Sequence, residues 1–475
     1  MDPKDLNEYI IDYAQKLGAS YVESRLISGD RSSFFSRNGD ILSGMRYSVC
    51  GIGTRVLVNG GLGFCSIDRI NKDLAEKAVL SAVKMAKNSN RTPPIEFGEP
   101  VVNEAKWQVE VKKPIEDVSI EEMMTFLTEL DTIAENPELP APIVSRVYSF
   151  GTNTQEYYLQ TSEGTKISAN TSIIRPMFIL TAKGQTDTEQ RFLDFTRSAG
   201  WEGTDGLIEE FTAQVGRLAK TAKAENQMKG IVDLVVAPEV AGIIAHENAG
   251  HPSEGDRILG REGAQAGESF WRTLKLGESR VGSAAVTIYD DPTIPGSAGF
   301  YTYDDEGVKS RKRTLIEKGI INEPLLNREF GLKFNQGSNG ASRAQDYNYE
   351  PIIRMANTYF AAGDYTLDEL VEDVKSGIYM ISFMEWNIDD RRYQSKYVGS
   401  ECYLIEKGEI TDILVKRPIM ELTTVGLFTA IDAVSKNLSF EFSATCGKSD
   451  PGQGVPVWCG GPELRLRNIR LGGLS

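Results

Sequence analysis

The spacing of the histidines is the feature that most restricts how this chain can fold locally. The sequence of 475 residues contains only two histidines, and both lie in the segment 246–251, His-Glu-Asn-Ala-Gly-His. Five residues of an ideal α-helix turn through about 500°, so the two imidazoles would point about 140° apart. They can face a common point only if the helix ends or bulges between them.

The residues around the second histidine favour a break in the helix. Gly250 suits a left-handed helix C-cap, and Pro252 biases the residue before it towards extended backbone. We therefore infer that His246 lies in the last helical turn and that His251 lies at the exit, turned back towards His246. A π-bulge of one residue is the other geometric solution.

The glutamate between the histidines indicates hydrolytic chemistry. Neutral imidazoles are good zinc ligands, and a carboxylate beside the ion can accept the proton of a metal-activated water as it attacks a carbonyl group. The familiar form of this motif is His-Glu-x-x-His. Because Glu247 directly follows His246, we interpret it as the catalytic base of a zinc metallopeptidase of the HExxxH type.

A catalytic zinc site also needs a third protein ligand and an open position. The chain has no third histidine, which leaves Cys446, Glu254, Asp256 and Cys459 as candidates. Cys446 is favoured, because Lys448 and the metal would both stabilise its thiolate and the neighbouring glycine permits a tight loop. His and Cys ligation suits zinc without excluding iron or cobalt.

Charge and cysteine usage exclude several classes of protein. The formal net charge of −15 argues against sequence-independent binding to nucleic acid or to an anionic membrane. No apolar run approaches the length of a membrane span, and the N-terminus lacks the pattern of a signal peptide, so we expect a cytoplasmic protein. The five cysteines include no Cys-x-x-Cys pair and predict no disulfide framework.

The pattern of apolar residues predicts an α+β protein whose C-terminal half is rich in strands. Asn59-Gly60 between two apolar runs predicts a β-hairpin, and Ser119 with Glu122 forms a capping box before a helix. The expected organisation is an N-terminal α+β subdomain at 1–90, a linker at 91–118, a second α+β subdomain at 119–229 and a β-rich catalytic domain with the HExxxH helix at 230–475.

A set of short motifs, all of them after residue 230, carries a resemblance to a known family. They are the segment 246–251, Glu254-Gly255-Asp256, Gly296-Ser297, Asp304-Asp305-Glu306-Gly307, Leu315-Ile316-Glu317-Lys318-Gly319, Arg354-Met355-Ala356-Asn357 and Thr445-Cys446-Gly447-Lys448. With these motifs the sequence resembles the TldD/PmbA metallopeptidases, specifically the active TldD-like branch, over nearly its whole length.

The resemblance implies a metal site and a mode of action. It implies Zn²⁺, one ion per active subunit, held by His246, His251 and Cys446, with Glu247 as the catalytic base. It also implies cleavage of unfolded or short peptides bound in extended form. A two-subunit assembly is implied too, as a homodimer or as a heterodimer with a PmbA-like paralogue.

Other functions are compatible with the same residues. The chain could be a zinc-stabilised regulatory protein that binds extended peptides without cutting them, in which case four protein ligands would close the site. It could also be a zinc amidase that acts on a small non-peptide substrate. Replacement of Glu247 distinguishes the first alternative from a peptidase, because only a peptidase needs the base.

Overall fold

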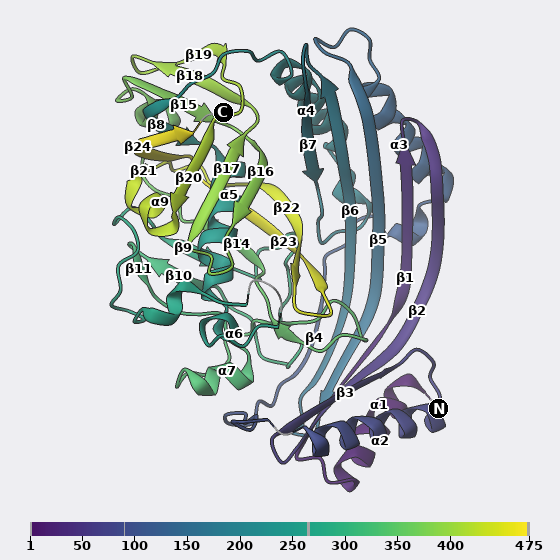
Figure 1. The fold of residues 1–475 in the computed structure, drawn as a ribbon. Coiled ribbons are helices and arrows are strands. Elements are labelled where there is room, and N and C mark those ends of the chain that lie inside the picture. The colour runs from purple at the N-terminus through teal and green to yellow at the C-terminus, as the bar shows by residue number, and fades with distance from the viewer. Residues whose placement is uncertain (1, 90, 264–266, 473–475) are drawn as a thin grey trace.

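The computed structural model describes residues 2–89, 91–263 and 267–472 of the chain (Figure 1). It is a mixed α+β fold with a long, curved N-terminal sheet and a C-terminal part rich in strands. Figure 1 shows the C-terminal part on the concave side of the curved sheet. The predicted fold class, α+β with a β-rich C-terminal region, is confirmed.

The N-terminal sheet is built around unusually long strands. Its strands are β1 (Tyr21–Arg37), β2 (Asp40–Val58), β3 (Gly61–Ile67), β4 (Glu104–Gln108), β5 (Ile143–Thr161), β6 (Lys166–Lys183) and β7 (Thr188–Asp194). They follow the order β3-β2-β1-β5-β6-β4, and β7 pairs with β6. The sheet therefore joins residues on both sides of the segment 91–118, and β4 lies within that segment.

Helices pack on this sheet in separate groups. They are α1 (Pro3–Lys16), α2 (Lys72–Asn88), α3 (Ile120–Ala134) and α4 (Leu207–Thr221). Helices α1 and α2 share a core with β1 and β2, whereas α3 and α4 share another with β5 and β6. The capping box of Ser119 and Glu122 is present at the start of α3. Asn59 and Gly60 adopt positive φ angles of 52° and 75° between β2 and β3, as the predicted hairpin requires.

A large sheet forms the outer layer of the C-terminal part. Its strands are β8 (Gly230–Val236), β15 (Ser376–Met380), β16 (Phe383–Ile388), β17 (Gln394–Gly399), β18 (Cys402–Glu406), β19 (Glu409–Leu414), β20 (Ile419–Thr423), β21 (Ile431–Val434) and β24 (Leu464–Gly472). The order is β16-β17-β20-β24-β8-β15-β18-β19, with β21 beside β24. β8, whose last three residues are buried, lies between β24 and β15 and leads directly into the next helix.

A smaller sheet carries the strands nearest to that helix. Its strands are β9 (Ile288–Asp290), β10 (Arg313–Glu317), β11 (Ile320–Ile321), β14 (Asn357–Phe360), β22 (Ser439–Lys448) and β23 (Gln453–Gly461), and β12 (Ser342–Arg343) pairs separately with β13 (Ile352–Ile353). The order is β11-β10-β9-β14-β23-β22, so β22 forms one edge. The C-terminal helices are α5 (Pro238–Ala245), α6 (Gly255–Ile258), α7 (Arg328–Lys333), α8 (Leu367–Val371) and α9 (Thr424–Ala430).

Helix α5 is held tightly against the smaller sheet. It packs on β14, β22 and β23, and all of its residues are buried. A Cβ atom at Gly242 would lie 2.6 Å from the carbonyl carbon of Cys459, so only glycine allows the helix to approach β23 this closely. This contact fixes where the segment after α5 meets β22. Across the described ranges, no helix has the length and apolar character needed to cross a membrane.

Candidate metal centre

The two histidines lie on a widened turn that continues α5. Residues 246–250 form a π-helical turn, and His251 begins a short 3₁₀ turn. Gly250 has φ −59° and ψ −64°, which is right-handed, so the predicted left-handed helix end before His251 is wrong and the π-bulge is the correct solution. The wider turn takes up the extra residue and brings the centroids of the two imidazole rings within 4.9 Å.

Cys446 approaches the same point from β22. The candidate ligand atoms of His246, His251 and Cys446 all lie within 4.8 Å of one another. The Sγ atom of Cys446 lies 3.5 Å from Nε2 of His251, although the two residues are 195 positions apart in the chain. All three side chains are buried. The structure thus brings together the three residues that the sequence proposed as ligands.

The charge state of the Cys446 thiol fits a metal ion. Burial raises the pKa of the Cys446 thiol, but His251, Arg354 and His246 outweigh burial and hold that pKa well below its usual value. A thiolate is the form that binds zinc. Among the described residues, Nδ1 of His246 is buried without a hydrogen-bond partner. This set of donors therefore fits a zinc ion with three protein ligands.

Glu254 and Asp256, two of the other predicted third ligands, form ion pairs with Lys448. Oε2 of Glu254 is 3.1 Å from Nδ1 of His251, which is the usual arrangement of a carboxylate that orients a metal-binding histidine. Lys448 pairs with Glu254 at 3.1 Å and with Asp256 at 2.8 Å. The expectation that Lys448 stabilises the thiolate is therefore wrong, because Arg354 takes that position and donates to the carbonyl oxygen of Cys446.

Glu254 itself is held in the ionised state. Burial raises the pKa of this carboxyl group, but Lys448 and Arg257 hold the pKa well below its usual value. An ionised Glu254 accepts a hydrogen bond from Nδ1 of His251 when that nitrogen carries the proton. Nε2 of His251, on the side of Cys446, then has a free lone pair for a metal ion. The surroundings of His251 thus select the tautomer that a metal ligand requires.

Glu247 lies at the same turn and is oriented by donors that sequence reasoning missed. Its side chain is buried, with 6% exposed. Trp386 Nε1 donates to Oε1 at 3.1 Å, and Arg392 Nη1 donates to Oε2 at 2.9 Å. Trp386 lies on β16 and Arg392 lies in the turn to β17, where its φ angle is 58°. A buried carboxylate needs partners, but no local pattern shows that they follow 139 and 145 residues later.

Asn248 anchors the π-helical turn from its other side. Its side-chain amide donates to Ser395 at 3.2 Å and to Thr424 at 2.7 Å, and Tyr397 donates to its carbonyl oxygen. These contacts tie the turn to β17 and to the start of α9. Glu247 and both histidines are therefore fixed by packing on either side of the turn.

Matches to family models cover most of the chain. Residues 229–473 match the PmbA/TldA metallopeptidase C-terminal domain, and residues 22–86 match the PmbA/TldA metallopeptidase domain 1. The C-terminal match contains all the residues of the candidate metal centre. Fold, site and family models together define the class of protein as a metallopeptidase.

Individual relatives give the same family. A metalloprotease of Methanocaldococcus jannaschii is 32% identical over 455 residues, which cover 94% of this chain and 95% of that protein. A zinc metalloprotease TldD homolog of Saccharolobus solfataricus is 33% identical over 263 residues, covering 54% of this chain and 55% of that one. The crystal structure of TldE from Thermococcus kodakarensis has the same fold, with a TM-score of 0.76, 17% identity and coverage of 98% and 100%. The chain belongs to the TldD/PmbA family of metallopeptidases.

Proposed function

We propose that this protein is a zinc-dependent peptidase that hydrolyses peptide bonds of unfolded or short peptides, with Glu247 as the general base. The observation that carries the proposal is the convergence of His246, His251 and Cys446 within 4.8 Å, next to the turn that also carries Glu247. A relative that is named a zinc metalloprotease supports the choice of metal.

The side chains around the site have separable roles in this reaction. When bound, zinc would supply a Lewis acid that activates water for attack on a carbonyl group. Glu247 accepts the proton of that water and returns it to the leaving amine. Arg392 and Trp386 hold the carboxylate of Glu247 in one orientation, since each donates to a different oxygen.

The edge position of β22 supports binding of the substrate in extended form. β22 ends the strand order of the smaller sheet and carries Cys446. The main chain of an edge strand can pair with an extended peptide, and such pairing reads the backbone that every peptide shares. A peptide bound along this edge would pass close to the candidate metal centre.

The proposal is tested by replacing Glu247 with Gln. We expect the variant to keep its zinc while peptide hydrolysis falls by about 10²–10⁴-fold, the usual contribution of general-base catalysis. Elemental analysis and mass spectrometry of a digested unstructured peptide measure both quantities. Glu385→Gln is the matched control, because Glu385 is an exposed residue of β16 whose ion pair at 3.5 Å is with Lys396.

Hydrolysis that persists in Glu247→Gln would refute the assigned base. A wild-type protein that binds peptides and zinc but cuts nothing would instead support the non-hydrolytic binding protein. Cleavage of a small amide beside intact peptides would indicate an amidase.

We also propose that the protein assembles from two subunits through the free edge of β2. Within the described residues β3 pairs only with Ile52–Val58, so the outer edge of the earlier part of β2 is unpaired. Ile41, Leu42, Met45 and Tyr47 are exposed on this part of the strand. A long apolar edge strand of this kind is normally covered. Light scattering of wild type and of Leu42→Lys, alone and with a PmbA-like paralogue, separates homodimer, heterodimer and monomer.

A further inference from the structure

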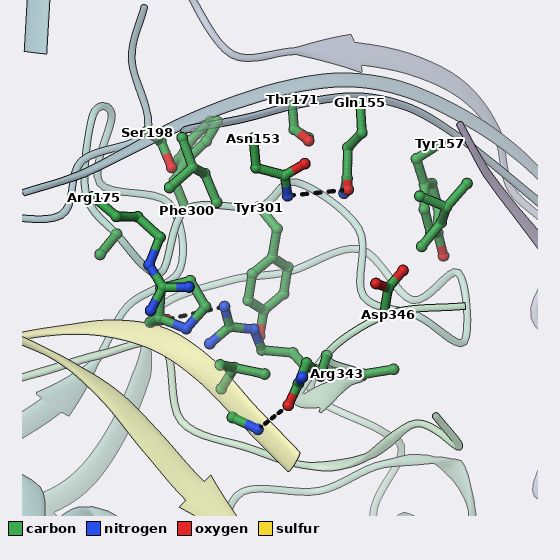
Figure 2. A pocket seen from close by; sticks show the side chains of 18 of the residues that line it. Asn153, Gln155, Tyr157, Thr171, Arg175, Ser198, Phe300, Tyr301, Arg343 and Asp346 are labelled. Atoms are coloured by element: carbon green, nitrogen blue, oxygen red, sulfur yellow. Dashed lines mark hydrogen bonds between the residues drawn. The ribbon is translucent and has the colours of Figure 1, made fainter. Parts of the chain in front are cut away.

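A cavity of about 480 Å³ lies between the N-terminal sheet and the β22–β23 hairpin (Figure 2). Strands β1, β5 and β6 form one wall, and residues 298–305 and 342–346 with the hairpin form the other. Thr445 lines the cavity, whereas the next residue, Cys446, points to the histidines. Successive side chains of a strand face opposite sides. The cavity and the candidate metal centre therefore lie on opposite faces of one strand.

Arginine side chains dominate the charge of this cavity. Arg25, Arg31, Arg175 and Arg343 line it. Arg31 pairs with Asp346 at 2.6 Å, and Arg25 lies 3.6 Å from a carboxylate oxygen of Glu23. In the part of the chain that the structure describes, neither of the other two arginines has a carboxylate within 4.0 Å. Within the described residues, two of the four arginines of the cavity therefore lack a direct ion-pair partner.

The unpaired arginines meet at the same place on the hairpin. Arg175 donates to the hydroxyl of Thr445, and Arg343 donates to the carbonyl oxygens of Pro456 at 3.1 Å and of Met355 at 2.6 Å. Thr445 and Pro456 are directly opposite each other in the pairing of β22 with β23. All these acceptors are neutral. Nε of Arg175 is buried and has no hydrogen-bond partner among the described residues.

Among the described residues, the acidic residues of the cavity form no ion pair with Arg175 or Arg343. Burial and the neighbouring Glu306 raise the pKa of Asp304 well above its usual value, which favours the neutral acid. Asp305 lies 4.0 Å from Arg25 and accepts hydrogen bonds from the hydroxyl of Tyr157 at 2.8 Å and from the backbone of Ala344 at 2.7 Å. Half-buried guanidinium groups without an anion are unfavourable. The geometry therefore calls for an anionic ligand.

We propose that this cavity binds the carboxylate group of a peptide, with Arg175 and Arg343 as its donors. The planar guanidinium group matches the two oxygens of a carboxylate better than it matches a single acceptor. Figure 2 shows Phe300 and Tyr301 beside these arginines, with the amides of Asn153 and Gln155 on the facing sheet. The aromatic rings suit an apolar side chain, and the amides suit peptide groups.

The choice of a peptide as the ligand rests on the proposed function, whereas the carboxylate follows from the charges alone. The carboxylate can come from the C-terminus of a peptide or from an acidic side chain. Both sources present the same pair of oxygens to the arginines, so the experiment includes a probe for each.

The test measures binding in the full-length Glu247→Gln protein, which removes hydrolysis from the comparison. Isothermal titration calorimetry uses N-acetylated Ala-Ala-Phe as the free acid and as the amide, and N-acetylated Ala-Glu-Phe amide. We expect the free acid, the Glu peptide or both to bind at least about tenfold more tightly than the Ala-Ala-Phe amide, as a charge-assisted hydrogen bond predicts. Arg175→Gln should abolish this preference, because it removes one of the two proposed donors. The fold should stay intact, since the hydrogen bond that Arg175 forms among the described residues is to the hydroxyl of Thr445.

The control is Arg217→Gln, which removes an arginine that lies outside the cavity and pairs with Glu401. Arg343→Gln should also abolish the preference. If Arg343→Gln fails to fold, the result with Arg175→Gln decides the question. Equal binding of acid and amide peptides overturns the proposal, as does a preference that survives Arg175→Gln.

The outcomes also separate this site from the peptidase proposal. A wild-type protein that cuts no peptide but shows the Arg175-dependent preference refutes the proposed hydrolysis and leaves the carboxylate site standing. A protein that hydrolyses peptides without any preference for a carboxylate refutes the site and leaves the peptidase standing.

Discussion

Replacement of Gly250 by Ala should disturb both stability and metal binding. A Cβ atom at this position would lie 2.1 Å from Sδ of Met355 and 3.3 Å from its Cγ. Ordinary contacts between such atoms are about 3.5–4.0 Å, so the sulfur would have to move by about 1.5 Å. Met355 is 0% exposed, so its side chain is enclosed by other residues. The substitution therefore overpacks a closed part of the core.

The magnitude follows from two opposing contributions. Overpacking of a core costs about 1–3 kcal/mol. The φ angle of Gly250 is one that alanine adopts without strain. Alanine also lowers the entropy of the unfolded chain, which stabilises the folded protein by about 0.4–1 kcal/mol. We expect a net loss of about 1–2 kcal/mol in the free energy of unfolding. Because His251 directly follows Gly250, zinc binding should weaken as well.

Urea unfolding and competition with a zinc chelator measure the two effects. Gly447→Ala is the matched control, since Gly447 also adjoins a candidate ligand but no heavy atom lies within 4 Å of its ideal Cβ position. Met355→Ala should destabilise the Gly250→Ala protein less than it destabilises the wild type, because the two sites are in contact. A Gly250→Ala protein with wild-type stability and wild-type zinc affinity would show that the packing argument is wrong.

Further substitutions separate the roles around the metal centre. Cys446→Ser should lower zinc affinity by more than about 100-fold, beyond the range expected for a residue that only orients a ligand. Glu254→Gln should lower zinc affinity by about 10–100-fold through its contact with His251, as chelator competition would show. Arg392→Gln should leave zinc bound and lower kcat for a peptide by about 10–100-fold, since Glu247 loses one of its orienting donors.

Each of these variants has a neighbour as its control. Cys459→Ser should keep its zinc, because Cys459 is not in the group of converging ligand atoms within the described residues. Asp256→Asn also removes a charge beside Lys448 but leaves the contact to His251 intact, so equal losses of zinc affinity for both acids would contradict the orienting role. Exposed Arg391 adjoins Arg392, and an Arg391→Gln variant with the same loss in kcat would point to a disturbed turn instead.

The sequence identified the three side chains that converge at the candidate metal centre, but it did not predict the backbone path between the two histidines. With only two histidines in the chain, the choice of His246 and His251 followed from chemistry alone. The choice between a helix end and a π-bulge depended on packing that the local sequence does not encode. Met355, which fits against Gly250, lies about a hundred residues further on. The donors to Glu247 were missed for the same reason.

The N-terminal sheet shows a similar limit. Local signals identified the hairpin at Asn59-Gly60 and the capped helix after Ser119, because these structures depend on neighbouring residues. The prolines of the segment 91–118 indicate a linker, and its sequence gives no clear signal for the short strand β4. That strand exists through parallel pairing with β6, which begins at Lys166. Pairing between distant strands leaves no mark on the local pattern.

The separation of Cys446 from the histidines affects when this site can form during synthesis. A growing chain that has not yet reached β22 carries the pair of imidazoles on the turn after α5 but lacks the sulfur that faces them. The cluster is completed only when nearly the last strands of the molecule dock on a helix made almost two hundred residues earlier. Incompletely synthesised or C-terminally truncated chains thus lack one of the three candidate ligands, because Cys446 lies close to the end of the sequence.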